Sequence, residues 1–172
     1  TTHITPFAYS NSRCLEYTAH AAGFYVFAYV DGTSNEIVYC YGDDDSWSSA
    51  TITGAAAPVP YDTANIDYVS IKVCPNDEYV HFAFVSNNAI FYARLDDPDN
   101  PVAGSFHTFQ SDNQGNPNTK FQRVDDDNNT KSTVSITVDD SSVPALNGAD
   151  RPHIVWDESN GGTWEVWYNY GD

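Results

Sequence analysis

Short polar turns flanked by aromatic residues are the segments of this sequence best suited to bind a ligand. Asn160 and two glycines lead into Trp164 and Glu165, and the polar turns 31–35 and 86–88 occupy matching places earlier in the chain. An aromatic ring can cover the apolar side of a sugar ring, while amide and carboxylate groups bind its hydroxyls. The sequence therefore predicts a carbohydrate site in which Trp164 is the exposed platform and Asn160 and Glu165 supply polar contacts.

Acidic residues gather at a second set of turns. Asp43 and Asp45 follow one predicted strand, and Asp96 and Asp99 follow another. Ca²⁺ prefers six to eight oxygen ligands from flexible loops, so these four residues are candidate calcium ligands, although their spacing differs from that of an EF-hand loop. The alternative interpretation is a solvated, solubilising surface that needs no ion.

Catalytic motifs are not found in the sequence. The arginines, which a sialidase-type enzyme would cluster around a carboxylate, occupy the unrelated positions 13, 94, 123 and 151. No nucleophile elbow, phosphate-binding loop or zinc-binding HExxH motif is present. With 24 acidic residues in the chain, two carboxylates can be neighbours by chance. We therefore expect a protein that is not an enzyme.

Two histidines occupy the same place in two copies of a repeated strand. His81 and His153 align with each other, and Val26 takes that place in the first copy. A strand histidine that is half-buried usually forms a hydrogen bond to a nearby group. We expect both to be structural residues bonded to neighbouring backbone.

The charge balance excludes several classes of partner. The 172 residues include 24 acidic and 7 basic ones, which gives a formal net charge of −17. Such a field repels nucleic acids and anionic lipid headgroups. No run of 18 apolar residues is present, so no helix is expected to insert into a membrane.

The chain begins at Thr1 and contains no methionine, which is typical of a mature secreted protein after removal of a signal peptide. Three cysteines, Cys14, Cys40 and Cys74, permit one disulfide and one remaining thiol, and the sequence leaves the pairing open. The sequence thus predicts a secreted, extracellular location.

The elements that must position these residues are β-strands in a repeated pattern. Alternating apolar strands separated by a short polar turn recur in three hairpins, at 24–43, 79–96 and 151–172. Tyr39, Tyr92 and Tyr168 fall in register, as do Tyr29, Phe84 and Trp156. A preceding strand is also repeated, at 69–73 and 134–138, with a weaker copy at 15–19.

A fourth strand follows the first two hairpins, at 49–53 and 105–109, and the segment 1–6 resembles it. We therefore expect one all-β domain over residues 1–172, made of antiparallel four-stranded units at roughly 11–54, 66–110 and 132–172, with 1–6 as a closing strand. Each unit has the size of a propeller blade. Three blades make too tight a ring, so oligomerisation is expected to complete it, either as a closed dimer or as a filament. A β-sandwich is the alternative fold.

Some segments resemble known propellers. The sequence from His153 to Gly162 and the stretch 28–47 are similar to blades of sialidase-type propellers and of fungal fucose-binding lectins. The resemblance implies a six-bladed lectin in which an Arg and a Glu act beside an aromatic residue. Arg94 and Glu36 are the nearest matches to that pair, and Trp47 matches the final Trp of the sialidase Asp-box.

Two functions remain open from the sequence. The first is a secreted, lectin-like propeller module that binds glycans as a homo-oligomer without catalysis. The second is a structural subunit of an extracellular filament or surface layer that assembles by donating a β-strand to a neighbour. An exposed aromatic residue beside Asn or Asp favours the first, whereas aromatics buried between subunits favour the second.

Overall fold

The structure is a computed structural model that describes residues 15–20, 23–43, 45–53, 66–74, 78–111, 117–125, 127–139 and 151–170. Within these residues the fold is all-β, with three antiparallel sheets of three or four strands, as the sequence predicts. The described part contains no helix that is long and apolar enough to cross a membrane. The predicted closing strand at 1–6 lies outside the described residues.

Sheet 1 contains the first repeat in the order β1-β2-β3-β4. Its strands are β1 (Leu15–Thr18), β2 (Phe24–Val30), β3 (Ile37–Gly42) and β4 (Trp47–Thr51). Apolar and aromatic residues alternate between the two faces of β2 and β3, and this pattern matches the period of two residues in a pleated strand.

Sheet 2 contains the second repeat in the order β10-β7-β6-β5. Its strands are β5 (Ile66–Val73), β6 (Val80–Ser86), β7 (Ala89–Leu95) and the short β10 (Gln122–Arg123). Every residue of β6 is buried. A strand covered on both faces is rich in apolar residues throughout, and β6 fits this rule.

The strand predicted at 105–109 is found only in part, since Phe106 bridges to Leu95 and the His107 amide donates to the Arg94 carbonyl at 3.0 Å. Ala103–Ser105 forms a 3₁₀ turn, and β8 (Phe109–Ser111) pairs with β9 (Pro117–Thr119) instead. The chain therefore turns away from β7 after residue 107. The remaining edge of β7 is paired by β10, so two separate segments share the place of the fourth strand.

Sheet 3 contains the third repeat in the order β11-β12-β13. Its strands are β11 (Thr130–Val138), β12 (Pro152–Asn160) and β13 (Thr163–Tyr170). Gly161 and Gly162 connect β12 to β13 with φ of 60° and 89°. Asn87 and Asn88 connect β6 to β7 with φ of 48° and 60°. Both pairs suit two-residue hairpin turns, because Gly and Asn tolerate this region best.

The strand pairings confirm the predicted repeat. Tyr39 lies opposite Ala28, Tyr92 opposite Ala83, and Tyr168 opposite Val155. We call the face with these residues the forward face of each sheet and the opposite face the rear face. Rear-face residues at equivalent places are Phe27, Phe82 and Ile154, and likewise Tyr29, Phe84 and Trp156.

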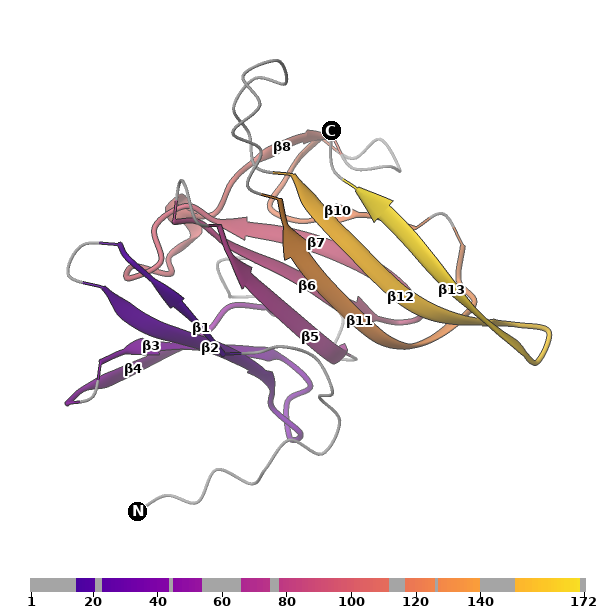
Figure 1. Ribbon diagram of the computed structural model, residues 1–172, viewed down its shortest axis with the longest axis horizontal. Coiled ribbons are helices and arrows are strands. Elements are labelled where there is room, and N and C mark those ends of the chain that lie inside the picture. Colours follow the sequence, from indigo (N-terminus) through magenta and orange to yellow (C-terminus); the bar gives the residue numbers. More distant parts are fainter. Residues whose placement is uncertain are drawn as a thin grey trace.

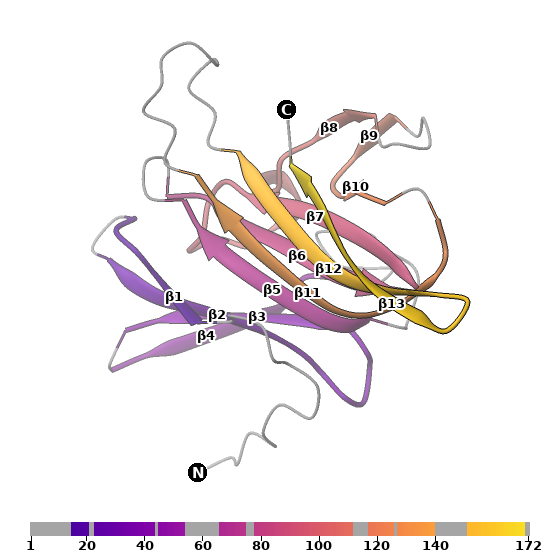
Figure 2. The same ribbon diagram turned by 45° about the vertical axis from the view of Figure 1, so that its right-hand side comes forward.

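The three sheets stack face to face (Figures 1 and 2). The forward face of sheet 1 and the rear face of sheet 2 form one apolar cluster, in which the Tyr39 and Phe82 rings lie 5.7 Å apart. The forward face of sheet 2 and the rear face of sheet 3 form a second cluster, which includes Tyr92 and Trp156. The stack thus has a fixed direction, since each forward face meets the next rear face.

The first strands of the three repeats lie beside one another. Lys72 on β5 forms an ion pair of 2.8 Å with Glu16 on β1, and the Ile136 amide of β11 donates to Ser70 Oγ on β5 at 3.3 Å. Figure 1 shows β5 between β1 and β11. The arrangement is consistent with consecutive propeller-like blades and with a layered β-sandwich.

Candidate functional site

The tip of the β12–β13 hairpin carries the predicted platform, Trp164. Its side chain is 55% exposed, and it lies opposite Ser159 in the strand pairing. Asn160, also exposed, pairs with Thr163 next to the glycine turn. Ser159 therefore shares the face of the accessible indole, whereas Asn160 and Thr163 lie on the opposite face of the same hairpin tip. An indole next to a hydroxyl on one face can contact the apolar side of a sugar ring and one of its hydroxyl groups.

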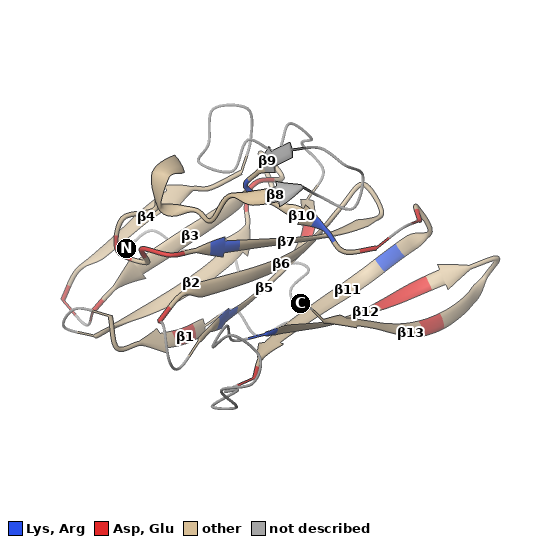
Figure 3. Cartoon of the chain, turned by 90° about the horizontal axis from the view of Figure 1, so that it is seen from above, with Lys and Arg blue, Asp and Glu red and all other residues tan. Residues whose placement is uncertain are grey.

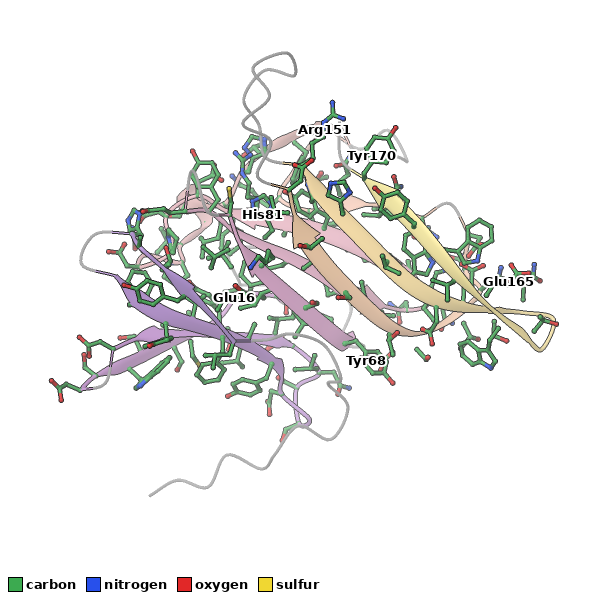
Figure 4. The ribbon with its side chains drawn as sticks, in the orientation of Figure 1. Glu16, Tyr68, His81, Arg151, Glu165 and Tyr170 are labelled. Atoms are coloured by element: carbon green, nitrogen blue, oxygen red, sulfur yellow. The ribbon has the colours of Figure 1, made fainter. Side chains whose placement is uncertain are left out.

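Glu165 lies on the same hairpin but faces the other way. It is exposed and opposite Glu158, and adjacent residues of a strand point to opposite faces. Figure 4 labels Glu165 near the tip of the hairpin. The structure therefore places Trp164 on one face of the hairpin and both Asn160 and Glu165 on the other, so the predicted residues share the hairpin tip but not a face.

Glu36 and Arg94 are not brought together. Glu36 immediately precedes β3, next to Asn35, whose carbonyl accepts from the Ile66 amide at the start of β5. Arg94 is near the end of β7 and is engaged by Asp96, with Nε to Oδ1 at 2.6 Å. Because the two residues are at opposite ends of their strands, they do not form the Arg–Glu pair that the resemblance implies.

Arg94 has a structural environment of its own. Its Nη2 lies 2.8 Å from His107 Nδ1, and its guanidinium carbon lies 4.6 Å from the centre of the Tyr79 ring. Although burial acts to lower it, the pKa of Arg94 is raised by the Asp96 carboxylate. The arginine is thus enclosed by an acid, an imidazole and an aromatic ring, which orients the loop after β7.

Trp47 begins β4, and its side chain is 48% exposed. Its ring lies 5.4 Å from that of Phe27 on the rear face of sheet 1. Asp43 shapes the preceding turn, because its Oδ1 accepts from the amides of Asp45 and Ser46 at 3.0 and 2.9 Å. These hydrogen bonds lower the pKa of Asp43. The Asp43 carboxylate is therefore committed to the turn.

The four predicted metal ligands do not converge. Asp43 and Asp45 are in the β3–β4 turn, whereas Asp96 is held by Arg94. Asp99 joins a different group, since ligand atoms of His20, Asp97 and Asp99 all lie within 4.8 Å of one another. A hydrogen bond with Asp97 raises the pKa of Asp99. This three-residue group is the arrangement closest to a cation site within the described residues.

His20 is the residue of this group that the sequence did not indicate. It follows β1 in the first repeat, whereas Asp97 and Asp99 follow β7 in the second, and His20 Nδ1 also lies 3.4 Å from Glu78 Oε2. The signal that could have found it is topological. In each antiparallel sheet, the turns after the first and third strands emerge at the same end. When the sheets stack, His20 after β1 is therefore at the same end as Asp97 and Asp99 after β7.

A buried ionic network joins sheet 3 to the segment after β10. The Lys131 side chain is 0% exposed, and its Nζ lies 2.8 Å from Asp125 Oδ2 and 2.6 Å from Asp127 Oδ1. Glu158 Oε2 lies 3.4 Å from the same Nζ. Burial acts to raise the pKa of Asp127, but the hydrogen bond from Lys131 is the first of several contacts that hold it at about 2. These carboxylates therefore serve the fold.

His81 and His153 form matching pairs with the tyrosines of the next strand. His81 Nδ1 lies 2.8 Å from the Tyr92 hydroxyl, and His153 Nδ1 lies 2.6 Å from that of Tyr168. Both histidines are therefore bonded to a neighbour, as predicted, but the partner of each Nδ1 is a tyrosine hydroxyl and not a backbone group. Burial lowers the pKa of His81 to about 3, so its imidazole is neutral at physiological pH.

The two ends of the stack are open among the described residues. On the forward face of sheet 3, Val166 is 79% exposed and Tyr168 54%; on the rear face of sheet 1, Leu15 is 58% exposed and Tyr17 54%. Isolated exposed apolar residues are common, but gathered ones mark interaction surfaces. The remaining large members are Val155, Trp164 and Tyr170 on sheet 3 and Tyr25 and Trp47 on sheet 1.

Charge is distributed unevenly over the molecule. Figure 3 shows that β2, β3 and β4 are free of Asp, Glu, Lys and Arg. Acidic residues lie instead in the turns after strands, such as Asp43, Asp97 and Asp99. The strongly acidic chain therefore retains neutral, aromatic sheet surfaces, which allow apolar contact.

No protein-family model matches the chain, and no curated protein matches it either.

Proposed function

We propose that the chain is a secreted carbohydrate-binding module without catalytic activity, which binds glycans at the tip of the β12–β13 hairpin. The observation that supports this most directly is the 55% exposure of Trp164 beside the polar turn at Asn160. A buried indole would serve packing, whereas this one offers a flat apolar surface to a ligand. The secreted location is the one expected from the sequence.

The absence of catalysis in this proposal is supported by the state of the buried carboxylates. Asp125 and Glu158 are 2% exposed, and both lie beside the buried Lys131 ammonium. A glycosidase needs an acid with a raised pKa and a second carboxylate facing the same bond. Neither carboxylate is available for such a role while Lys131 occupies the space between them.

The proposal also includes several copies of the module acting together. A single indole platform binds a sugar weakly, and joining sites in one assembly multiplies the strength of attachment without new contacts. A homo-oligomer would therefore suit a protein that attaches to repeated glycans on a surface.

In this proposal, calcium is a cofactor that would bind to the group formed by His20, Asp97 and Asp99. Two carboxylates at Asp97 and Asp99 supply the oxygen ligands that Ca²⁺ prefers, and the His20 imidazole adds nitrogen, which suits transition metals better. The binding assay below is therefore run with Ca²⁺ and with EDTA. Unchanged glycan binding in EDTA would remove calcium from the proposal.

A glycan array tests the proposal. The wild-type chain should bind a subset of immobilised glycans, and Trp164→Ala should weaken that binding about tenfold, because an aromatic contact contributes roughly 1.5 kcal/mol. Trp164→Tyr is the matched control and should retain most of the binding. Failure of the wild type to bind any glycan, or equal binding by Trp164→Ala, would contradict the proposal.

A second function, a structural subunit of an extracellular filament or surface layer, is favoured by the outer edge of β13. Within the described residues no strand pairs with that edge, whereas β4 covers β3 and β10 covers part of β7. An open edge presents backbone groups that accept a strand from another chain. Electron microscopy of concentrated protein distinguishes the two functions, because a structural subunit should form ordered fibres or sheets.

A further inference from the structure

The two open faces of the stack are the same kind of surface as the faces buried inside it. Val166 on the forward face of sheet 3 is equivalent to Ile90 of sheet 2 and Ile37 of sheet 1, since each lies opposite the same position of the preceding strand. Ile90 and Ile37 are 0% exposed, whereas Val166 is 79% exposed. Val166 is thus an apolar residue at a position that is buried in sheets 1 and 2, where the next sheet covers the forward face.

The rear face of sheet 1 shows the same relation in the other direction. Leu15 is equivalent to Ile71 of sheet 2 and Ile136 of sheet 3, because each lies opposite the matching residue of the next strand. Ile71 is 0% exposed and Ile136 is 3% exposed, whereas Leu15 is 58% exposed. The rear face is therefore built for contact with a preceding sheet.

We infer that the forward face of sheet 3 docks onto the rear face of sheet 1 of a second copy of this chain. The docking repeats the two contacts already present within the chain, where a forward face meets a rear face each time. This docking specifies the contact that would form the homo-oligomer of the proposed function, and it does not depend on glycan binding. The surfaces differ from each other, so the contact is head to tail.

The internal contacts specify which residues meet. Tyr39 packs against Phe82, with ring centres 5.7 Å apart. Tyr168 occupies the place of Tyr39, and Phe27 occupies the place of Phe82. The docked pair is therefore Tyr168 of one copy against Phe27 of the other.

The composition of both faces suits this occupant. The rear face of sheet 1 offers Leu15, Tyr25, Phe27 and Trp47, and β2, β3 and β4 contain no charged residue. Two copies that each carry −17 repel one another at long range. The uncharged strands of sheet 1 limit that repulsion, and the acid on the facing surface, Asp157 opposite Val166, accepts hydrogen bonds from Ser132 and Thr133. Added salt should strengthen the docking by screening the remaining repulsion.

The repeat number gives the size of the assembly. A closed propeller ring contains four to eight blades, and a chain that contributes three sheets can reach that range only with six. Two copies joined at both contacts therefore close the ring. Trp164 remains accessible, because the β12–β13 hairpin continues two pairs beyond the end of the β6–β7 hairpin and Trp164 lies in the first of them, level with the exposed turn residues Asn87 and Asn88.

Complementation between two variants tests the direction of docking. Val166→Glu disables the forward face and Leu15→Glu the rear face, and both residues are more than half exposed, so neither variant should unfold the chain. Light scattering should give a wild-type dimer and two monomeric variants. An equimolar mixture should restore a dimer, because one intact forward face and one intact rear face remain. Val102→Glu, a 50% exposed site away from both faces, adds the same charge and should leave the dimer unchanged.

Each other result overturns a stated part of the inference. A monomeric wild type, or a mixture that stays monomeric, excludes the docking. Loss of the dimer in only one variant indicates a symmetric contact and excludes the head-to-tail arrangement. Open polymers of the wild type exclude ring closure. Glycan binding abolished by Val166→Glu in a monomeric protein would identify the forward face as a ligand platform instead.

Cross-linking provides a second measurement, which does not depend on the two Glu variants. Tyr168→p-benzoylphenylalanine places a photoreactive group on the forward face. After irradiation of the full chain, mass spectrometry should find the cross-link in the partner's peptide that contains Phe27. A cross-link to β12 or β13 of the partner would overturn the inference. Neither measurement involves a sugar. Docking can therefore fail while glycan binding succeeds, and glycan binding can fail while docking succeeds.

Discussion

Sheet 2 and sheet 3 are built from the same repeat, yet their surroundings differ. In sheet 2, β6 is buried along its whole length, whereas in sheet 3 nearly every residue of β13 is exposed. The His–Tyr pair shows the contrast most clearly, because Tyr92, beside His81, is 7% exposed whereas Tyr168, beside His153, is 54% exposed. Neighbouring sheets therefore decide what the same residues do.

The comparison also shows how sheet 3 is held at the end of the stack. Its rear face shares an apolar cluster with sheet 2, and the Lys131 network ties β11 and β12 to Asp125. The cluster supplies most of the driving force, because burial of apolar surface is the dominant favourable contribution. The network adds ion pairs between β11, β12 and the segment after β10.

The largest effect is expected from removing the centre of this network. Lys131→Met leaves Glu158 buried without a cation and Asp125 with Arg123 as its one remaining cation partner, and this should lower the free energy of unfolding by about 3–5 kcal/mol. Urea unfolding at pH 7 measures the change. Lys72→Met is the control, because the ion pair of Lys72 with Glu16 is more exposed, at 20% and 12%, and should cost less than Lys131→Met. Equal losses in both variants would contradict the assigned role of the network.

A second effect compares equivalent positions of the two sheets directly. Ile90→Ala should destabilise the chain by about 2–5 kcal/mol, since Ile90 is fully buried. Val166→Ala should change stability by less than about 0.5 kcal/mol in dilute protein, since Val166 is 79% exposed. Chemical unfolding of both variants at low concentration is the measurement. A large loss in dilute Val166→Ala would show that the forward face of sheet 3 is covered within one chain.

A smaller effect depends on pH. The pKa of His81 is lowered by burial from 6.5 to about 3. As pH falls below 6.5, the unfolded chain takes up a proton that the folded chain does not, so stability is complete above pH 6.5 and is lost toward pH 3. Between pH 6.5 and pH 5 the loss should be about 2 kcal/mol.

His81→Leu isolates this contribution from that of the carboxylates. Unfolding curves across the pH range should show a shallower decline for His81→Leu than for the wild type. Tyr92→Phe keeps the buried imidazole and should retain the wild-type decline. Identical pH profiles for wild type and His81→Leu would show that His81 does not titrate as inferred.

Much of the fold could be predicted from residue patterns. Alternation located β2, β3, β6, β7, β12 and β13, and the register of Tyr39, Tyr92 and Tyr168 is found in the strand pairings. The fourth strand of sheet 2 could not be predicted in this way. A short edge strand such as β10 leaves little alternation to detect, and its pairing with β7 depends on the hairpin of β8 and β9.

The candidate site was predictable only in part. Trp164 departs from the packing pattern beside a glycine turn, and the structure places it in solvent. The resemblance selected Glu36 and Arg94, but a match of residue types does not specify which ends of two strands meet. His20 was missed because it belongs to a different repeat from Asp97 and Asp99, and only the stacked sheets bring them together.

The sequence by itself determined the strand periods, the glycine and asparagine turns, the acidic loops and the equivalence of the three repeats, because each depends on neighbours along the chain. The tertiary structure alone decided which faces are buried, which carboxylates are neutralised by Lys131, and which end of the stack holds His20 with Asp97 and Asp99. Burial and pairing arise from contacts between distant segments. Two sheet faces with the same residue pattern therefore differ in exposure, since another sheet packs against one of them and the other is open.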